Sequence, residues 1–273
     1  GYETSLIYFE HKNDYWTQKC MQSQCCKNFG SEDDQSDNLD LNITDLWLND
    51  GPATKLNGTD YEEFIFLRQL EGVIEAHDTK EPLFLFYAPH LVHCPLQVPE
   101  EYLDKFSFMT DDEGECAAQT PYAIPNQPKR FEYRCRQQYR AMVNLLDGQI
   151  GSLVQKLKAR GMWDDALLVF TADNGGPLVR DESGATNFPL RGGKYSNFEG
   201  GIRSAAFVSG GYLPPAVRGT VSNELVHIAD WYATFAALAG MDAHDGLAAR
   251  SGLPPVDGLD LWPVLSGSAH RSP

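Results

Sequence analysis

The chain of 273 residues lacks any apolar run near the ~18 residues that a membrane-spanning helix needs. Internal repeats are not apparent either. The first residues, Gly1-Tyr2-Glu3-Thr4-Ser5, have neither the basic region nor the apolar region of a signal peptide. What remains is a globular chain, whose 42% apolar residues can build the core of one large domain or two small ones.

Basic residues are also scarce. Twenty-two Lys and Arg stand against 38 Asp and Glu, for a formal net charge of -16. Such an acidic chain is a poor partner for nucleic acid, because phosphate binding depends on a basic surface. An anionic substrate is disfavoured as well, unless a local cationic pocket overrides the field of the whole chain.

The six cysteines follow neither zinc-binding spacing nor the spacing of a thioredoxin-like pair. Cys116 and Cys135 flank a Pro-containing insertion, and we predict a disulfide that closes this loop. A bridge from Cys20 to Cys25 or Cys26 is a second possibility.

Two glycosylation sequons begin at Asn42 and Asn57, each in a polar stretch. Together with the predicted disulfide they favour the secretory pathway, with a lysosomal or extracellular destination.

Short apolar strands alternate with helical patterns, which predicts an α/β fold. We expect a mixed, mostly parallel central sheet flanked by helices. Apolar runs predict buried strands at 83–87, 166–170 and 205–208, and three- and four-residue spacing predicts helices at 61–74, 139–157 and 225–238. Residues 104–134 look like an irregular insertion.

Asp173 and Asn174 follow the strand at 166–170 and precede two glycines. Ligands in open α/β folds bind beyond the carboxyl ends of strands, and carboxylate and amide oxygens suit Ca²⁺ or Mg²⁺. Two side chains are too few for a complete calcium site. The alternative is an Asx turn that reverses the chain after the strand.

A cationic, glycine-rich segment comes next, with Lys194 in Arg-Gly-Gly-Lys and Arg203 in Glu-Gly-Gly-Ile-Arg. Glycines let a backbone approach a ligand closely, and a cation among them can hold an oxyanion. His93, after the strand at 83–87, can bind an anion or protonate a leaving group. Each of these residues also has a purely structural interpretation: the cations can belong to a basic surface loop, and the histidine can be structural. His90 is a second candidate for the role of His93.

Longer stretches carry a resemblance to a known family. They are PLFLFYAPHLVHCPLQVPEEYL (82–103), YRAMVNLLDGQIGSLVQKLKARGMWDDALLVFTADNGG (139–176), NFPLRGGKYSNFEGGIRSAAFV (187–208), ELVHIADWYATFAALAG (224–240) and DGLDLWPVLSG (257–267). Their order and spacing over about residues 61–267 resemble the sulfatases, in the arylsulfatase B-like branch of the alkaline phosphatase superfamily. The resemblance implies that residues 1–273 form part of a sulfatase catalytic domain with an alkaline phosphatase-like fold.

The resemblance also implies a calcium-dependent hydrolase of sulfate esters. By that likeness Asp173 and Asn174 ligate Ca²⁺, Lys194 contacts the sulfate, and His93 rather than His90 faces it. Arg203 matches a segment in which structural support is expected. The substrate implied is an aryl sulfate or a sulfated sugar.

The chain departs from the family pattern at the nucleophile. In the family a formylglycine arises from the cysteine of a Cys-x-Pro-Ser-Arg segment that follows an Asp-Asp metal pair near the first strand. The chain contains neither this arrangement nor the Gly-Lys-x-His segment. We therefore expect an incomplete catalytic domain that lacks its N-terminal part and is inactive alone. The alternative is a non-catalytic sulfatase-like protein that binds a sulfated ligand, whereas the long match disfavours a phosphodiesterase relative.

Overall fold

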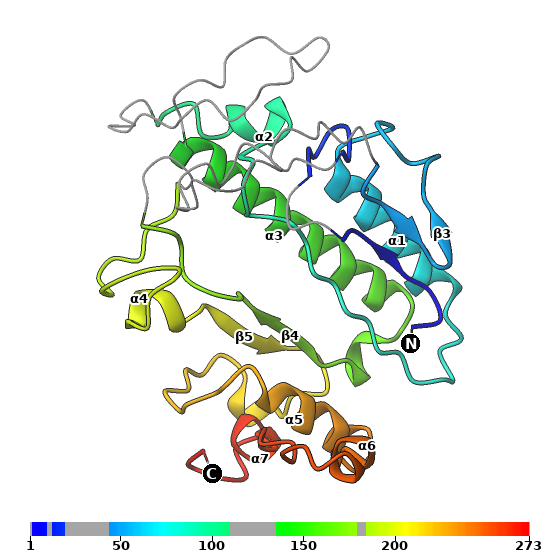
Figure 1. Ribbon diagram of the computed structural model, residues 1–273, viewed down its shortest axis with the longest axis vertical. Helices are drawn as coiled ribbons and strands as arrows, with labels where there is room; N and C mark the ends of the chain where they lie inside the picture. The colour runs from blue at the N-terminus through cyan, green and yellow to red at the C-terminus, as the bar shows by residue number, and fades with distance from the viewer. Residues whose placement is uncertain (1, 10–12, 20–43, 110–134, 179–183, 273) are drawn as a thin grey trace. The chain divides into compact units, whose positions relative to one another are not determined.

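The computed structural model describes residues 2–9, 13–19, 44–109, 135–178 and 184–272, and it divides into two compact units (Figure 1). The first unit comprises Gly1–Met162 and Thr171–Ala206, and the second comprises Trp163–Phe170 and Phe207–Pro273. All the residues expected to form the site, at 93, 173, 174 and 194, belong to the first unit.

The first unit is built mainly from helices. They are α1 (Glu62–Ala76), α2 (Glu100–Asp104), α3 (Cys135–Ala159) and the short α4 (Glu199–Ile202). A small antiparallel sheet in the order β1-β2-β3 accompanies them, formed by β1 (Leu6–Ile7), β2 (Trp47–Leu48) and β3 (Gly51–Pro52).

The second unit holds most of a two-stranded sheet and three further helices. The strands are β4 (Leu168–Thr171) and β5 (Ala206–Ser209), and the helices are α5 (Asp230–Leu238), α6 (Gly246–Arg250) and α7 (Trp262–Leu265). Single 3₁₀ turns lie at Trp163–Asp165 (η2) and Pro215–Val217 (η4).

Helices α1 and α3 lie side by side and enclose the main core of the first unit (Figure 1). Leu70 and Ile74 of α1 pack against Leu153 of α3, and these side chains repeat at the spacing of one helical face. Two of the three helices predicted from apolar spacing, at 61–74 and 139–157, are thereby confirmed, although α3 begins earlier than predicted, at Cys135. Gly161 follows α3 with a φ of 69°, the left-handed conformation that commonly ends a helix.

The segment 83–87, predicted as a buried strand, forms no strand within the described part of the chain. Its side chains alternate: Leu85 and Tyr87 pack on the α1–α3 core, while Phe84 and Phe86 are 60% and 66% exposed. A strand needs the backbone of a neighbour, and the apolar run could not reveal that the described residues supply none here.

The strands at 166–170 and 205–208 are confirmed with shifted boundaries, as β4 and β5. Hydrogen bonds from Ala172 N to Ala205 O and from Tyr212 N to Ala166 O flank the pair, so the two segments run in opposite directions. The β4 residues are half-buried or exposed rather than buried on both faces. The larger, mostly parallel sheet is not formed by the described residues and stays a prediction.

Other expectations have mixed outcomes. The helix expected over 225–238 begins only at Asp230, whose carboxylate accepts a hydrogen bond from His227 N. Cys135 is disulfide-bonded, but Cys116 and most of the insertion at 104–134 lie outside the described residues, as does Asn42. Asn57 is half-buried, and its glycosylation stays a prediction. No helix among the described residues is long and apolar enough to cross a membrane.

Candidate active site

His93 and Lys194, 101 positions apart in the sequence, meet in the first unit. The Nζ atom of Lys194 lies 3.5 Å from Nε2 of His93. The other ring nitrogen of His93, Nδ1, lies 2.8 Å from the carbonyl oxygen of Cys94 and 3.6 Å from its Sγ. Since a carbonyl only accepts, Nδ1 carries a proton, and Nε2 of the neutral ring presents its lone pair to the lysine.

Lys194 is positioned through its backbone by the segment that contains Asp173 and Asn174. Its amide donates to the carbonyl oxygen of Gly176 at 3.0 Å, and the Gly175 amide donates to the carbonyl of Gly201 at 3.0 Å. The structure thus joins the segment of the acidic pair to the cationic segment.

Glycine is required where these two segments touch. A Cβ on Gly175 would lie 1.7 Å from the carbonyl oxygen of Gly200, and one on Gly193 would lie 2.4 Å from that of Gly176. Backbone therefore packs directly on backbone. The amide of Asn187 adds a pair of hydrogen bonds to Gly176, at 2.9 Å to its N–H and 2.8 Å to its C=O.

Asp173 and Asn174 form a turn, and their oxygens fit part of a calcium site. The Asp173 carboxylate accepts a hydrogen bond from Asn174 N at 2.8 Å, and Asn174 Nδ2 donates to Gly175 O at 2.9 Å. Because the amide nitrogen is used, the Asn174 carbonyl oxygen stays available as a hard ligand beside the exposed carboxylate. No group of three or more His, Cys, Asp or Glu within the described ranges could complete a metal site.

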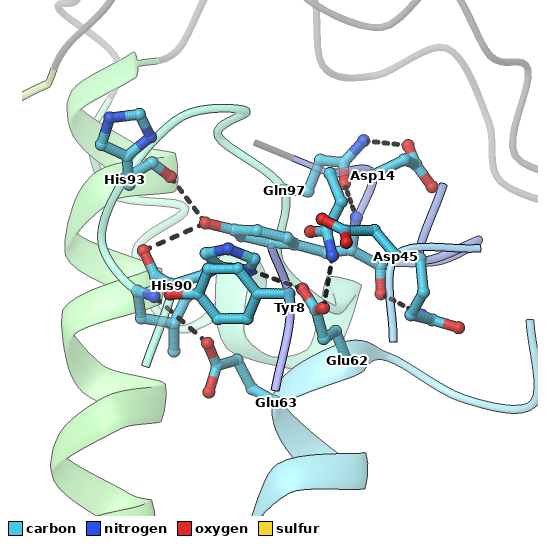
Figure 2. A network of polar contacts seen from close by, with 12 residues as sticks. Tyr8, Asp14, Asp45, Glu62, Glu63, His90, His93 and Gln97 are labelled. Atoms are coloured by element: carbon cyan, nitrogen blue, oxygen red, sulfur yellow. Dashed lines mark hydrogen bonds and ion pairs between the residues drawn. The ribbon is translucent and has the colours of Figure 1, made fainter. Parts of the chain in front are cut away.

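A buried polar network lies beneath the loop that carries His93 (Figure 2). Glu62, the first residue of α1, accepts hydrogen bonds from Asn13 Nδ2 at 2.6 Å and pairs with His90 Nδ1 at 2.8 Å. Gln97 links the same network to Asp14 at 2.7 Å. The Glu62 and His90 side chains are 0% and 4% exposed. His90 is therefore committed to a buried pair, while His93 holds the position beside Lys194.

Glu63 and Tyr15 fasten the loop backbone. The Glu63 carboxylate accepts from Leu91 N at 3.2 Å and from the Tyr87 hydroxyl at 2.7 Å. The Tyr15 hydroxyl lies 3.1 Å from His90 O and 2.9 Å from His93 O. Both ends of the turn around His93 are thus tied to the protein interior.

Burial dominates the electrostatics of this network. It raises the pKa of Glu62 to about 8, against the opposing hydrogen bond from Asn13 and with added repulsion from Asp45 and Asp14. It raises the pKa of Glu63 to about 7, against the hydrogen bond from Tyr87. Tyr8, whose ring centroid is 3.4 Å from that of His90, has its pKa raised to about 12, chiefly by burial.

The His93 pKa is also raised, first by its hydrogen bond with the Cys94 side chain. Burial and the charge of Lys194 act in the opposite direction. A raised pKa increases the fraction of imidazolium at a given pH. An ammonium and an imidazolium at 3.5 Å repel each other, and an anion bound to both would neutralise that repulsion.

Sequence reasoning missed Glu62, Glu63 and Tyr15. Two adjacent glutamates at the start of a helix usually lie on the surface, where their negative charges interact favourably with the helix dipole. Arg203 was expected to give structural support, and its guanidinium lies 3.5 Å from the Glu199 carboxylate one helical turn earlier.

Comparisons with known proteins place this geometry in context. The family model described as Sulfatase matches residues 1–241. Arylsulfatase J of Mus musculus is 31% identical over 229 residues, which cover 84% of this chain and 32% of that protein. The N-acetylgalactosamine-6-sulfatase of Homo sapiens is 28% identical over 203 residues, covering 74% of this chain and 32% of that protein.

Among solved structures, that of Ps i-CgsB in complex with k-i-k-neocarrahexaose resembles the chain with a TM-score of 0.61 and 30% identity. The match covers 82% of this chain and 42% of that one. The chain therefore spans about a third of the length of these curated relatives and less than half of the solved structure.

Proposed function

Because the chain belongs to the sulfatase family, we propose that it supplies the sulfate-binding part of a calcium-dependent hydrolase that acts on sulfated sugars. The single observation that carries the proposal is the approach of Lys194 Nζ to His93 Nε2 at 3.5 Å, beside the segment of Asp173 and Asn174. We also propose that the full catalytic domain contains the larger, mostly parallel sheet of an alkaline phosphatase-like fold.

Each cationic residue has a distinct role. The ammonium of Lys194 binds the sulfate oxygens and stabilises the charge that develops on them. His93 holds its Nδ1 proton on Cys94 O, so that Nε2 is the atom that gains or gives a proton at the site. Its raised pKa favours the imidazolium, which can donate to a sulfate oxygen or to the departing alcohol.

Asp173 and Asn174 would hold part of the coordination sphere of Ca²⁺. The ion, when bound, neutralises negative charge on a sulfate group. Two oxygen donors satisfy only part of the six to eight that calcium takes, so the remaining ligands would come from outside the described residues. The formylglycine nucleophile is expected from a segment that these 273 residues do not contain.

The names of similar proteins support the substrate class, and a disulfide supports the compartment. One relative is named for N-acetylgalactosamine 6-sulfate and one solved structure contains a hexaose, which supports a sugar. The disulfide at Cys135 supports an oxidising compartment, such as the lysosome or the extracellular space.

Calorimetry and an activity assay on the purified chain test the proposal together. With Ca²⁺ present, we expect 4-nitrophenyl sulfate to bind, to remain uncleaved, and to bind about 10–100-fold more weakly after Lys194→Ala. Arg203→Ala is the matched control and should change binding less than about threefold, since the Arg203 side chain is 64% exposed and pairs with Glu199. Hydrolysis by this chain would contradict the expectation that it lacks the nucleophile. Unchanged binding in Lys194→Ala would contradict the assignment of Lys194 to the sulfate site.

A second candidate is a non-catalytic sulfatase-like protein that binds a sulfated ligand. The absence of a Cys-x-Pro-Ser-Arg segment from the 273 residues favours it. Sequencing the transcript upstream of the Gly1 codon separates the two. An in-frame Asp-Asp pair followed by Cys-x-Pro-Ser-Arg supports the enzyme, and a start or stop codon shortly before Gly1 supports the binding protein.

A further inference from the structure

Tyr195 occupies a backbone position that suits glycine better than tyrosine. The amide of Ser196 donates to Gly193 O at 3.0 Å, which closes a four-residue turn with Tyr195 as its third residue. Tyr195 has a φ of 71°. A positive φ at this place is typical of a type II turn, where glycine is the usual residue because a side chain there meets steric cost.

Burial does not favour the tyrosine either. Its side chain is 67% exposed, so the ring gains little from burial on folding. Phe198, three positions on, is less exposed at 46%, and its ring lies under the Arg191 guanidinium at 4.1 Å. A large aromatic in a strained and exposed position points to a role in binding rather than in folding.

The ring borders the proposed sulfate pocket. The Nζ atom of Lys194 lies 5.4 Å from the Tyr195 ring centroid and 3.5 Å from His93 Nε2. A sulfate held between Lys194 and His93 therefore has an aromatic face next to it. Sugar rings have apolar C–H faces, which pack well on such a surface.

We propose that Tyr195 is a specificity-determining residue that packs against the ring of a sugar sulfate while Lys194 and His93 hold its sulfate group. This inference rests on the proposed function and extends it, because it names the residue that distinguishes a ring-bearing sulfate ester from a small one.

Binding of two monoesters with the same charge tests the inference. N-Acetylgalactosamine 6-sulfate carries a sugar ring and methyl sulfate carries none. NMR titration of the 273-residue chain with Ca²⁺ present should show about tenfold tighter binding of the sugar sulfate, as expected for one covered aromatic face. Tyr195→Gly should bring the two ligands within about twofold and leave methyl sulfate binding unchanged.

Three variants keep the test decisive. Tyr195→Gly suits the positive φ, so it should fold at least as well as the parent. Tyr195→Phe retains the ring and should retain the preference. Phe108→Ala removes another exposed aromatic of the first unit, and it should change neither affinity.

The possible outcomes separate the two proposals. If methyl sulfate binds through Lys194 but Tyr195→Gly keeps the tenfold preference, the inference about Tyr195 is overturned and the proposed function stands. If methyl sulfate does not bind, or binds equally well after Lys194→Ala, the proposed function is overturned and this inference with it.

Discussion

The two segments that meet at the candidate site are held in place by different means. The loop around His93 rests on buried side chains, among them Glu62, Glu63 and Tyr15, which are at most 1% exposed. The segment around Lys194 rests on backbone contacts between glycines, such as Gly175 against Gly200. The first support is electrostatic and depends on protonation. The second is steric and depends on the absence of side chains.

This difference has a practical consequence. Changes of pH should act mainly on the His93 side of the site, because its supports titrate. Small additions of volume should act mainly on the Lys194 side, because its supports leave no room. The predictions below test this contrast, from the largest expected effect to the smallest.

Stability should fall as the pH rises. The folded-state pKa values of Glu62 and Glu63, about 8 and 7, lie above the ordinary value of 4.5, so the folded chain binds more protons between these limits. The stabilisation is complete below pH 4.5 and is lost as the pH passes 7 and then 8. At about 1.4 kcal/mol per pKa unit, the free energy of unfolding should drop by up to about 6 kcal/mol from pH 5 to pH 9.

Urea unfolding of Glu62→Gln at these two pH values provides the check. The variant should show a clearly shallower pH dependence than the parent, since it removes one titrating group. Glu75→Gln, on the same helix but 60% exposed, is the matched control and should keep the full slope. An equal slope in all three proteins would contradict the buried-carboxyl account.

Gly175→Ala should disrupt the Lys194 side. Its Cβ would lie 1.7 Å from Gly200 O, so the two backbones must separate, at a cost of about 2–4 kcal/mol. Gly72→Ala is the control, because its Cβ meets nothing within 4 Å and alanine favours the helix by up to about 1 kcal/mol. Thermal unfolding of both variants measures the contrast. Similar behaviour of the two would show that these glycines are not close-packed.

Tyr15→Phe should have a smaller effect, on the His93 side. Loss of the hydroxyl leaves the carbonyl oxygens of His90 and His93 without its hydrogen bonds, which costs about 1–2 kcal/mol. The pKa of His93, followed by NMR, should shift as its loop relaxes. A loss of stability with no change in the His93 pKa would show that Tyr15 stabilises the core but does not position the His93 loop.

The same contrast explains which parts of the structure could be predicted from the sequence. Helices α1 and α3 follow from local periodicity, and the pair of His93 and Lys194 follows from motifs and their resemblance to a family. Whether residues 83–87 form a β-strand depends on a neighbouring strand, and the apolar sequence of this segment carries no information about that neighbour. The burial of Glu62 and Glu63 depends on Asn13, His90 and Tyr87, which lie far away in the sequence.

Tyr195 represents a third case. The sequence places this tyrosine directly after Lys194. Only the folded structure shows that its φ is positive and that its ring lies beside the Lys194 ammonium. Sequence patterns locate chemistry along the chain, whereas the reasons for an unusual residue emerge from its conformation.

Titration of inorganic sulfate into the 273-residue chain, followed through the His93 ring resonances by NMR, tests the central claim most directly. The account predicts saturable shifts of the His93 resonances and a rise in the His93 pKa on binding, because the anion favours the imidazolium. Lys194→Ala should weaken that binding about 10–100-fold. Unchanged His93 resonances, or binding that survives the loss of Lys194, would contradict the claim that these two residues form an anion site.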